Sequence, residues 1–175
     1  MNASLPIILP GDVFGTRNPQ SLGRAIICVE AWKAEALCAE YSHAGIILNS
    51  AGATFEAVWH IETQNIFEAY KGQRVIIARW HGMCPDAFAK GWSAVKDEAG
   101  MTYPYCRLAL HLLGLAKWIH FGKGTVCSEL AEKFLINAGY TMGLAGRNWW
   151  GLSPQELVDE WRISNYINVI YEGTI

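Results

Sequence analysis

Hydrophobic and polar positions indicate a pair of neighbouring strands near residue 50. Segment 44–48 is rich in apolar and β-branched residues, and segment 53–59 alternates polar and apolar side chains. The residues between them, Asn49-Ser50-Ala51-Gly52, have the composition of a turn. The pattern therefore predicts an antiparallel hairpin over residues 44–59.

The loop of this hairpin sets which residues face one another. A two-residue loop and a four-residue loop both place Glu56 opposite Gly45, and therefore on the same face as His43. Diagonal neighbours of this kind are about 7–8 Å apart at the backbone. A glutamate and an imidazole can close that distance to a hydrogen bond, and Gly45 leaves the space for it. We therefore expect Glu56 to orient His43.

Apolar residues at steps of three and four predict a helix over residues 127–138, which Gly139 is placed to end. A capping box, Ser153-Pro154-Gln155-Glu156, opens another helix. We expect an α+β fold, in which an antiparallel sheet packs against helices. The expected elements also include helices over 18–38, 85–99, 105–119 and 154–161 and strands over 74–80 and 166–171.

Cys127 lies at the start of the helix predicted over 127–138. The free N–H groups of a first helical turn and the positive end of the helix dipole favour a thiolate, which is the nucleophilic form of cysteine. A buried structural cysteine is the alternative, because free cysteines are among the most buried residues. A base beside the thiol would identify Cys127 as a nucleophile, and His43 is the best candidate for this base. His60 is the alternative base, because it falls on the same face of the predicted hairpin.

A cysteine at a helix start, a strand histidine and a carboxylate form the nucleophile, base and orienter of cysteine hydrolases. Here the histidine precedes the cysteine, which is the reverse of the order in papain-like enzymes. With these features the chain resembles the circularly permuted papain-fold branch of the NlpC-type cysteine peptidases, small bacterial and phage proteins that include YiiX-like hydrolases. The segments that carry the resemblance are Pro10-Gly11-Asp12-Val13-Phe14, Ser42-His43-Ala44-Gly45-Ile46, Phe55-Glu56-Ala57 and Cys127-Ser128-Glu129-Leu130.

The resemblance implies a permuted papain-like fold and thiol-dependent hydrolysis of amide bonds, such as those of a cell-wall peptide. It implies the catalytic residues Cys127, His43 and Glu56 and no cofactor. Segment Gly100-Met101-Thr102-Tyr103 is similar to the Gly-x-x-Tyr element of the family, which makes Tyr103 a candidate substrate-binding residue near the oxyanion. Pro104 stands where the family often has an acidic residue, so either Tyr103 or Tyr105 faces the site.

Two other functions stay open at this point. A lipid ester hydrolase or acyltransferase would use the same cysteine and histidine, and the apolar segment 108–118 and Trp149-Trp150 would suit an acyl chain. The other is a noncatalytic module that binds lipid or peptide.

Asp12 is expected to cap a turn.

Composition favours a single domain over residues 1–175, because 51% of the residues are hydrophobic and 17% are charged. A net charge of −2 without a Lys/Arg run argues against nucleic-acid binding. We expect no transmembrane segment and no signal peptide, and therefore synthesis that ends in the cytoplasm. The five cysteines lack paired spacing, which indicates neither disulfides nor a metal site.

Overall fold

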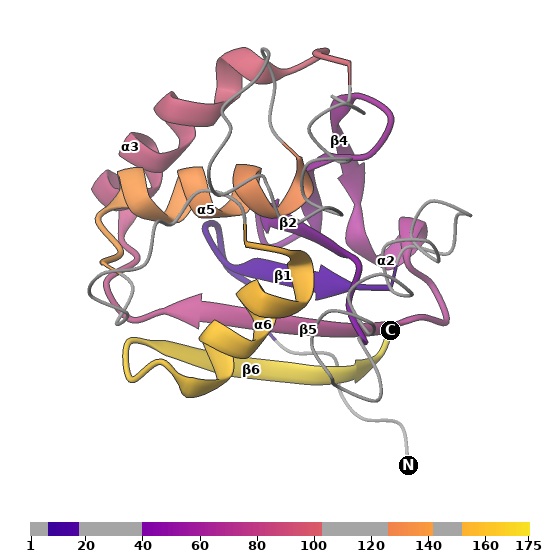
Figure 1. Cartoon of the computed structure of the whole chain (residues 1–175). Coiled ribbons are helices and arrows are strands. Elements are labelled where there is room, and N and C mark those ends of the chain that lie inside the picture. The colour runs from indigo at the N-terminus through magenta and orange to yellow at the C-terminus, as the bar shows by residue number, and fades with distance from the viewer. Residues whose placement is uncertain (1–6, 18–39, 103–125, 142–151) are drawn as a thin grey trace.

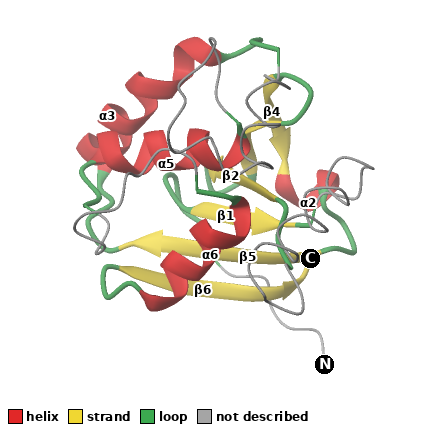
Figure 2. Cartoon of the chain, viewed as in Figure 1, coloured by secondary structure: helices red, strands yellow, loops and turns green. Residues whose placement is uncertain are grey.

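The computed structural model describes residues 7–17, 40–102, 126–141 and 152–175, which form an antiparallel sheet with helices (Figures 1 and 2). The strand order in this six-stranded sheet is β4-β3-β2-β1-β5-β6. The strands are β1 (Val13–Thr16), β2 (His43–Ile47), β3 (Ala53–Ala57), β4 (Ile61–Asn65), β5 (Arg74–Trp80) and β6 (Ile167–Thr174). The helices are α2 (Ile66–Ala69), α3 (Pro85–Val95), the 3₁₀ turn η1 (Lys96–Glu98), α5 (Cys127–Ala138) and α6 (Pro154–Ile163).

The predicted hairpin is confirmed, with the expected register. Strands β2 and β3 pair antiparallel, with Gly45 opposite Glu56. The backbone N–H of Leu48 donates to Ala53 O over 2.7 Å, and Gly52 in the turn has a φ of 90°. Glycine adopts this positive φ without the steric cost that a side chain would add. The strands are shorter than the predicted span of 44–59, because β3 ends at Ala57.

Gly45 is held between two side chains that leave no room for another. A Cβ at this position would lie 2.5 Å from the Phe14 ring and 3.1 Å from Glu56 Cβ. We expect Gly45→Ala to lower the free energy of unfolding by about 1–3 kcal/mol, as overpacking in a rigid core does. Urea denaturation measures this change. The control is a double-mutant cycle with Phe14→Leu, which should recover part of the loss; an unchanged cost in that background would contradict the steric explanation.

Several predicted elements agree with the structure, and others need correction. Strand β5 has the predicted bounds, and β6 extends beyond the predicted 166–171. The helix predicted over 85–99 ends at Val95, because the chain tightens into η1 and then reaches Gly100 with a φ of 78°. Strand β4 and the short helix α2 were not predicted. The helices expected over 18–38 and 105–119 lie outside the described residues.

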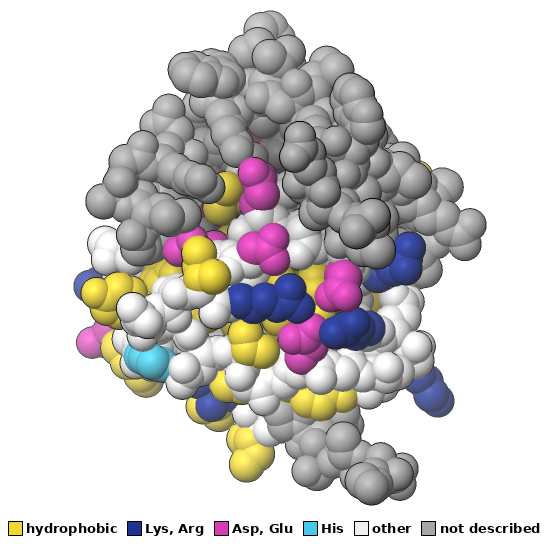
Figure 3. Space-filling model, turned by 60° about the horizontal axis from the view of Figure 1, so that its bottom comes forward, with side chains coloured by type: hydrophobic (Ala, Val, Ile, Leu, Met, Phe, Trp, Pro, Cys, Tyr) yellow, Lys and Arg dark blue, Asp and Glu magenta, His cyan; other side chains and the backbone are white. Residues whose placement is uncertain are grey.

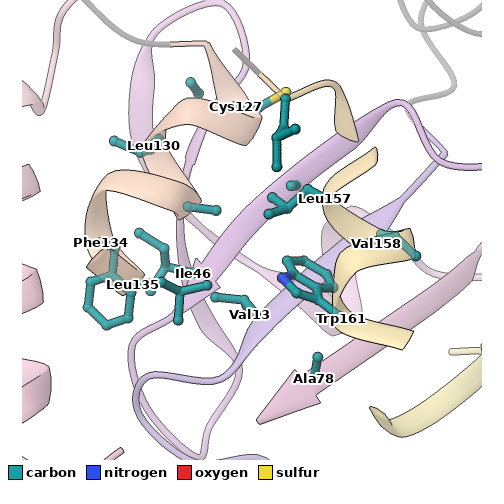
Figure 4. Close-up of a cluster of buried hydrophobic side chains, with 14 of the residues drawn as sticks. Val13, Ile46, Ala78, Cys127, Leu130, Phe134, Leu135, Leu157, Val158 and Trp161 are labelled. Atoms are coloured by element: carbon teal, nitrogen blue, oxygen red, sulfur yellow. The ribbon is translucent and has the colours of Figure 1, made fainter. Parts of the chain in front are cut away.

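The sheet has an apolar cluster on each face. The larger cluster contains Ala44 and Ile46 of β2 together with residues of α5 and α6 (Figure 4). The smaller cluster contains Phe14, Ile47 and Tyr70. Successive residues of β2 therefore alternate between the two faces, as the pleat of a strand requires. Helix α5 packs against β2 and β3, and α6 packs against β6 (Figure 1).

Asp12 has the structural role that the sequence predicts, with an addition. Its carboxylate accepts a hydrogen bond from the backbone N–H of Leu9 over 2.8 Å, which caps the turn before β1. The Arg79 guanidinium also donates to both oxygens of Asp12, over 2.7 and 2.8 Å. This bidentate pair ties the N-terminal turn to β5.

Charged side chains of opposite sign lie side by side on the surface in Figure 3. In one such network, Glu172 accepts hydrogen bonds from Arg74 and Arg162, each over 2.8 Å. Glu40 lies 3.2 Å from Arg74 and 3.6 Å from Arg162. These described arginines therefore have acidic neighbours and do not form an open basic patch. None of the helices in the described ranges is long and apolar enough to cross a bilayer.

Candidate active site

Cys127 is the first residue of α5, as the sequence predicts. The N-cap is Val126, whose backbone N–H donates to Glu129 Oε2 over 3.3 Å. The hydroxyl of Ser128 donates to the carbonyl of Leu152 over 2.7 Å, which anchors this end of the helix to the segment before α6. Cys127 is 3% exposed. The sulfur is thus buried at the positive end of a 12-residue helix.

His43, the first residue of β2, lies between Cys127 and Glu56. Its Nε2 is 2.6 Å from Glu56 Oε2, and the side chain of Cys127 is near enough to raise the pKa of His43 by its charge and hydrogen bonding. Both His43 and Glu56 are buried. The structure therefore brings together the three residues that the sequence selected, from β2, β3 and the start of α5.

Two residues that the sequence did not select complete the surroundings of Glu56. The hydroxyl of Thr54 donates to Glu56 Oε1 over 2.6 Å, and the phenol of Tyr70 donates to Glu56 Oε2. Thr54 lies two residues before Glu56 on the same strand face, so the alternation of the strand could have indicated it. Tyr70 follows α2, and no local pattern points to it.

These hydrogen bonds decide the ionisation of Glu56. Burial by itself raises the pKa of a carboxyl group. At Glu56, the hydrogen bond and charge of His43, with the hydroxyl groups of Thr54 and Tyr70, outweigh burial and lower the pKa from its ordinary value. The carboxylate is therefore charged at neutral pH although it is fully buried.

The electrostatics of His43 favour the charged imidazolium. Burial by itself lowers the pKa of a histidine, but the charge and hydrogen bond of Cys127 and then those of Glu56 raise the pKa of His43 to about 10. The ring also packs against Phe14 and Tyr70, with centroids 6.2 and 6.0 Å away. These contacts fix the plane of the imidazole.

The remaining candidates do not join this group. His60 is exposed and forms an isolated β-bridge with Thr102 beyond the end of β3, so in this register His43 contacts Cys127 and His60 does not replace it. Tyr103 and Tyr105 lie outside the described residues. Cys84, at the N-cap of α3, is exposed. Across the described ranges there is no cluster of three or more His, Cys, Asp or Glu side chains arranged to hold a metal ion.

Comparisons with known proteins support the fold. No family model matches the chain. No curated protein matches it significantly either. The crystal structure of the metalloprotein yiiX from Escherichia coli O157:H7 is similar, with a TM-score of 0.67 and 15% sequence identity. The match covers 97% of this chain and 99% of that chain, so the chain has a YiiX-like fold.

Proposed function

We propose that the chain is a single-domain thiol hydrolase with a permuted papain-like arrangement, which cleaves amide bonds of peptides. The observation that supports this proposal most is the buried series of contacts from Cys127 through His43 to Glu56. A nucleophile, a base and a group that orients the base are the parts that cysteine hydrolases require. A purely structural cysteine needs neither the histidine nor the buried carboxylate.

In the proposed reaction, His43 and Cys127 form an imidazolium–thiolate pair. Glu56 holds Nε2 of His43, so Nδ1 is the nitrogen that takes the proton of Cys127. The sulfur attacks the carbonyl carbon, and the oxyanion accepts a hydrogen bond from the backbone N–H of Cys127. His43 then gives its proton to the departing amine, which leaves an acyl thioester on Cys127. Water, activated by the neutral His43, attacks the thioester, and the acid product and the free thiol form.

A resident metal ion does not fit the residues described here, although the similar solved structure is that of a metalloprotein. Zinc sites in proteins use three or four protein ligands. Cys127 offers a sulfur and His43 one nitrogen, whereas both oxygens of Glu56 already accept hydrogen bonds from protein side chains. The proposed reaction therefore has no step through a metal ion and uses Cys127, His43 and Glu56.

The test of this function compares the wild type with Cys127→Ala on two substrate classes. The purified proteins are incubated with peptidoglycan fragments and with short-chain acyl esters, and the products are followed by mass spectrometry. We expect peptide cleavage by the wild type and a loss of about 10⁵-fold or more in Cys127→Ala, as for other nucleophile deletions. Cleavage of esters alone would identify an acyl ester hydrolase. No turnover of either class would contradict hydrolysis and favour the noncatalytic binding module.

A further inference from the structure

Tyr70 and His43 share one oxygen of Glu56. The Tyr70 phenol and His43 Nε2 both bond to Oε2, whereas Thr54 bonds to Oε1. Tyr70 is 4% exposed, and its ring centroid lies 5.6 Å from that of Phe14. The phenol is thus fixed against the same carboxylate oxygen that orients the imidazole.

The short helix α2 places Tyr70 at this oxygen. The backbone N–H of Ile66 donates to Gly52 O in the β2–β3 turn over 2.9 Å, which attaches α2 to the hairpin. The N–H of Tyr70 then donates to Ile66 O over 3.1 Å and closes the helix. Tyr70 is therefore positioned by the same hairpin that carries His43 and Glu56.

Two donors on one oxygen compete for its negative charge. The positive end of the Tyr70 O–H dipole lies beside the charge that Glu56 offers to His43, and so reduces the stabilisation of the imidazolium. Burial and the nearby Glu56 charge raise the pKa of Tyr70, so the phenol keeps its proton while His43 titrates. Removal of the hydroxyl would leave more of the carboxylate charge for the imidazole.

We propose that Tyr70 is a positioning residue that acts through Glu56 and sets the pH at which His43 loses its proton. The described ionisable groups that act on both His43 and Tyr70 are Cys127 from α5 and Glu56 from β3. Glu62 of β4 acts on Tyr70 as well. The inference rests on the proposed function in treating His43 as the partner of a reacting thiol. Through Glu56, Tyr70 would adjust the pKa of His43 without contact with the substrate.

The test follows His43 itself by NMR. Protein labelled with ¹⁵N-histidine is titrated from about pH 6 to about pH 11, and the ring nitrogen shifts report the protonation of His43. We expect Tyr70→Phe to raise the midpoint of the His43 titration by about half a pH unit or more. In this variant Oε2 of Glu56 no longer accepts the phenol hydrogen bond, and its charge stabilises the imidazolium more. Thr54→Val is the matched control. It removes a hydroxyl from the other oxygen of Glu56 and should move the midpoint less.

A purely structural role for Tyr70 predicts a different result. Tyr70→Phe would then lower the thermal midpoint of unfolding without moving the titration, and this outcome would overturn the proposal. A downward shift, or an equal shift in Thr54→Val, would overturn it as well. The NMR titration needs no substrate, so its failure is distinguishable from the failure of hydrolysis, which the comparison of wild type with Cys127→Ala detects.

Discussion

Replacement of His43 by alanine should make the alkylation of Cys127 more strongly pH-dependent between about pH 5 and about pH 8 than in the wild type, because the proposed ion pair with the imidazolium is lost. Only the thiolate reacts with iodoacetamide. In the wild type, the imidazolium beside the sulfur persists to high pH, because the pKa of His43 is raised to about 10. Without that charge, an ordinary thiol is only about 0.03% thiolate at about pH 5, and this fraction rises tenfold per pH unit.

The size of this effect follows from two opposing terms. Relative to a complete ion pair, an ordinary thiol at about pH 5 has roughly a thousandfold less thiolate, and the higher intrinsic reactivity of a more basic sulfur returns about one to two orders of magnitude. We expect His43→Ala to react about tenfold or more slowly there. Mass spectrometry measures the rate at Cys127 against exposed Cys84 in the same protein, which corrects for reagent and buffer. The same pH profile in both proteins would contradict the proposed ion pair.

The hairpin could be predicted in detail because its register depends on a few local residues. The turn residues between Leu48 and Ala53 limit the loop, and the period of two in a strand then places Glu56 beside His43. The start of α5 at Cys127 and its end at Gly139, which has a φ of 108°, were likewise readable from local signals. Such signals act over a few residues, and sequence alone contains them.

The rest depends on contacts between elements, which local patterns do not encode. Strand β4 contains one apolar residue at Ile61 and four polar ones, so its pairing with β3 leaves little hydrophobic signal. Tyr70 reaches Glu56 only because α2 turns the chain back over the hairpin. The meeting of Cys127 with His43 requires α5 to pack on the sheet. The sequence could select the two residues by their chemistry, but local patterns could not place them side by side.

Replacement of Glu56 by alanine should give the largest loss of stability among these variants, about 3–5 kcal/mol in the free energy of unfolding. The change leaves three buried groups without their partner: the imidazole of His43 and the hydroxyl groups of Thr54 and Tyr70. Glu56→Gln is the matched control, because it keeps the shape and one oxygen acceptor. It should cost about 1–3 kcal/mol, the cost of leaving part of a buried hydrogen-bonding group unsatisfied.

The pH dependence separates the charge of Glu56 from its shape. The pKa of Glu56 is lowered in the folded protein, so its stabilisation is present above the ordinary value of 4.5 and is lost as the pH falls through the folded pKa. For His43, whose pKa is raised, the stabilisation is present below 6.5 and is lost as the pH rises through about 10. Urea denaturation from about pH 3 to about pH 7 should therefore show the difference between wild type and Glu56→Gln shrinking below about pH 4.5, where unfolding of the wild type is accompanied by proton uptake at Glu56. A difference that stays constant over this range would show that the carboxylate contributes shape and hydrogen bonds, and that its charge does not stabilise the fold.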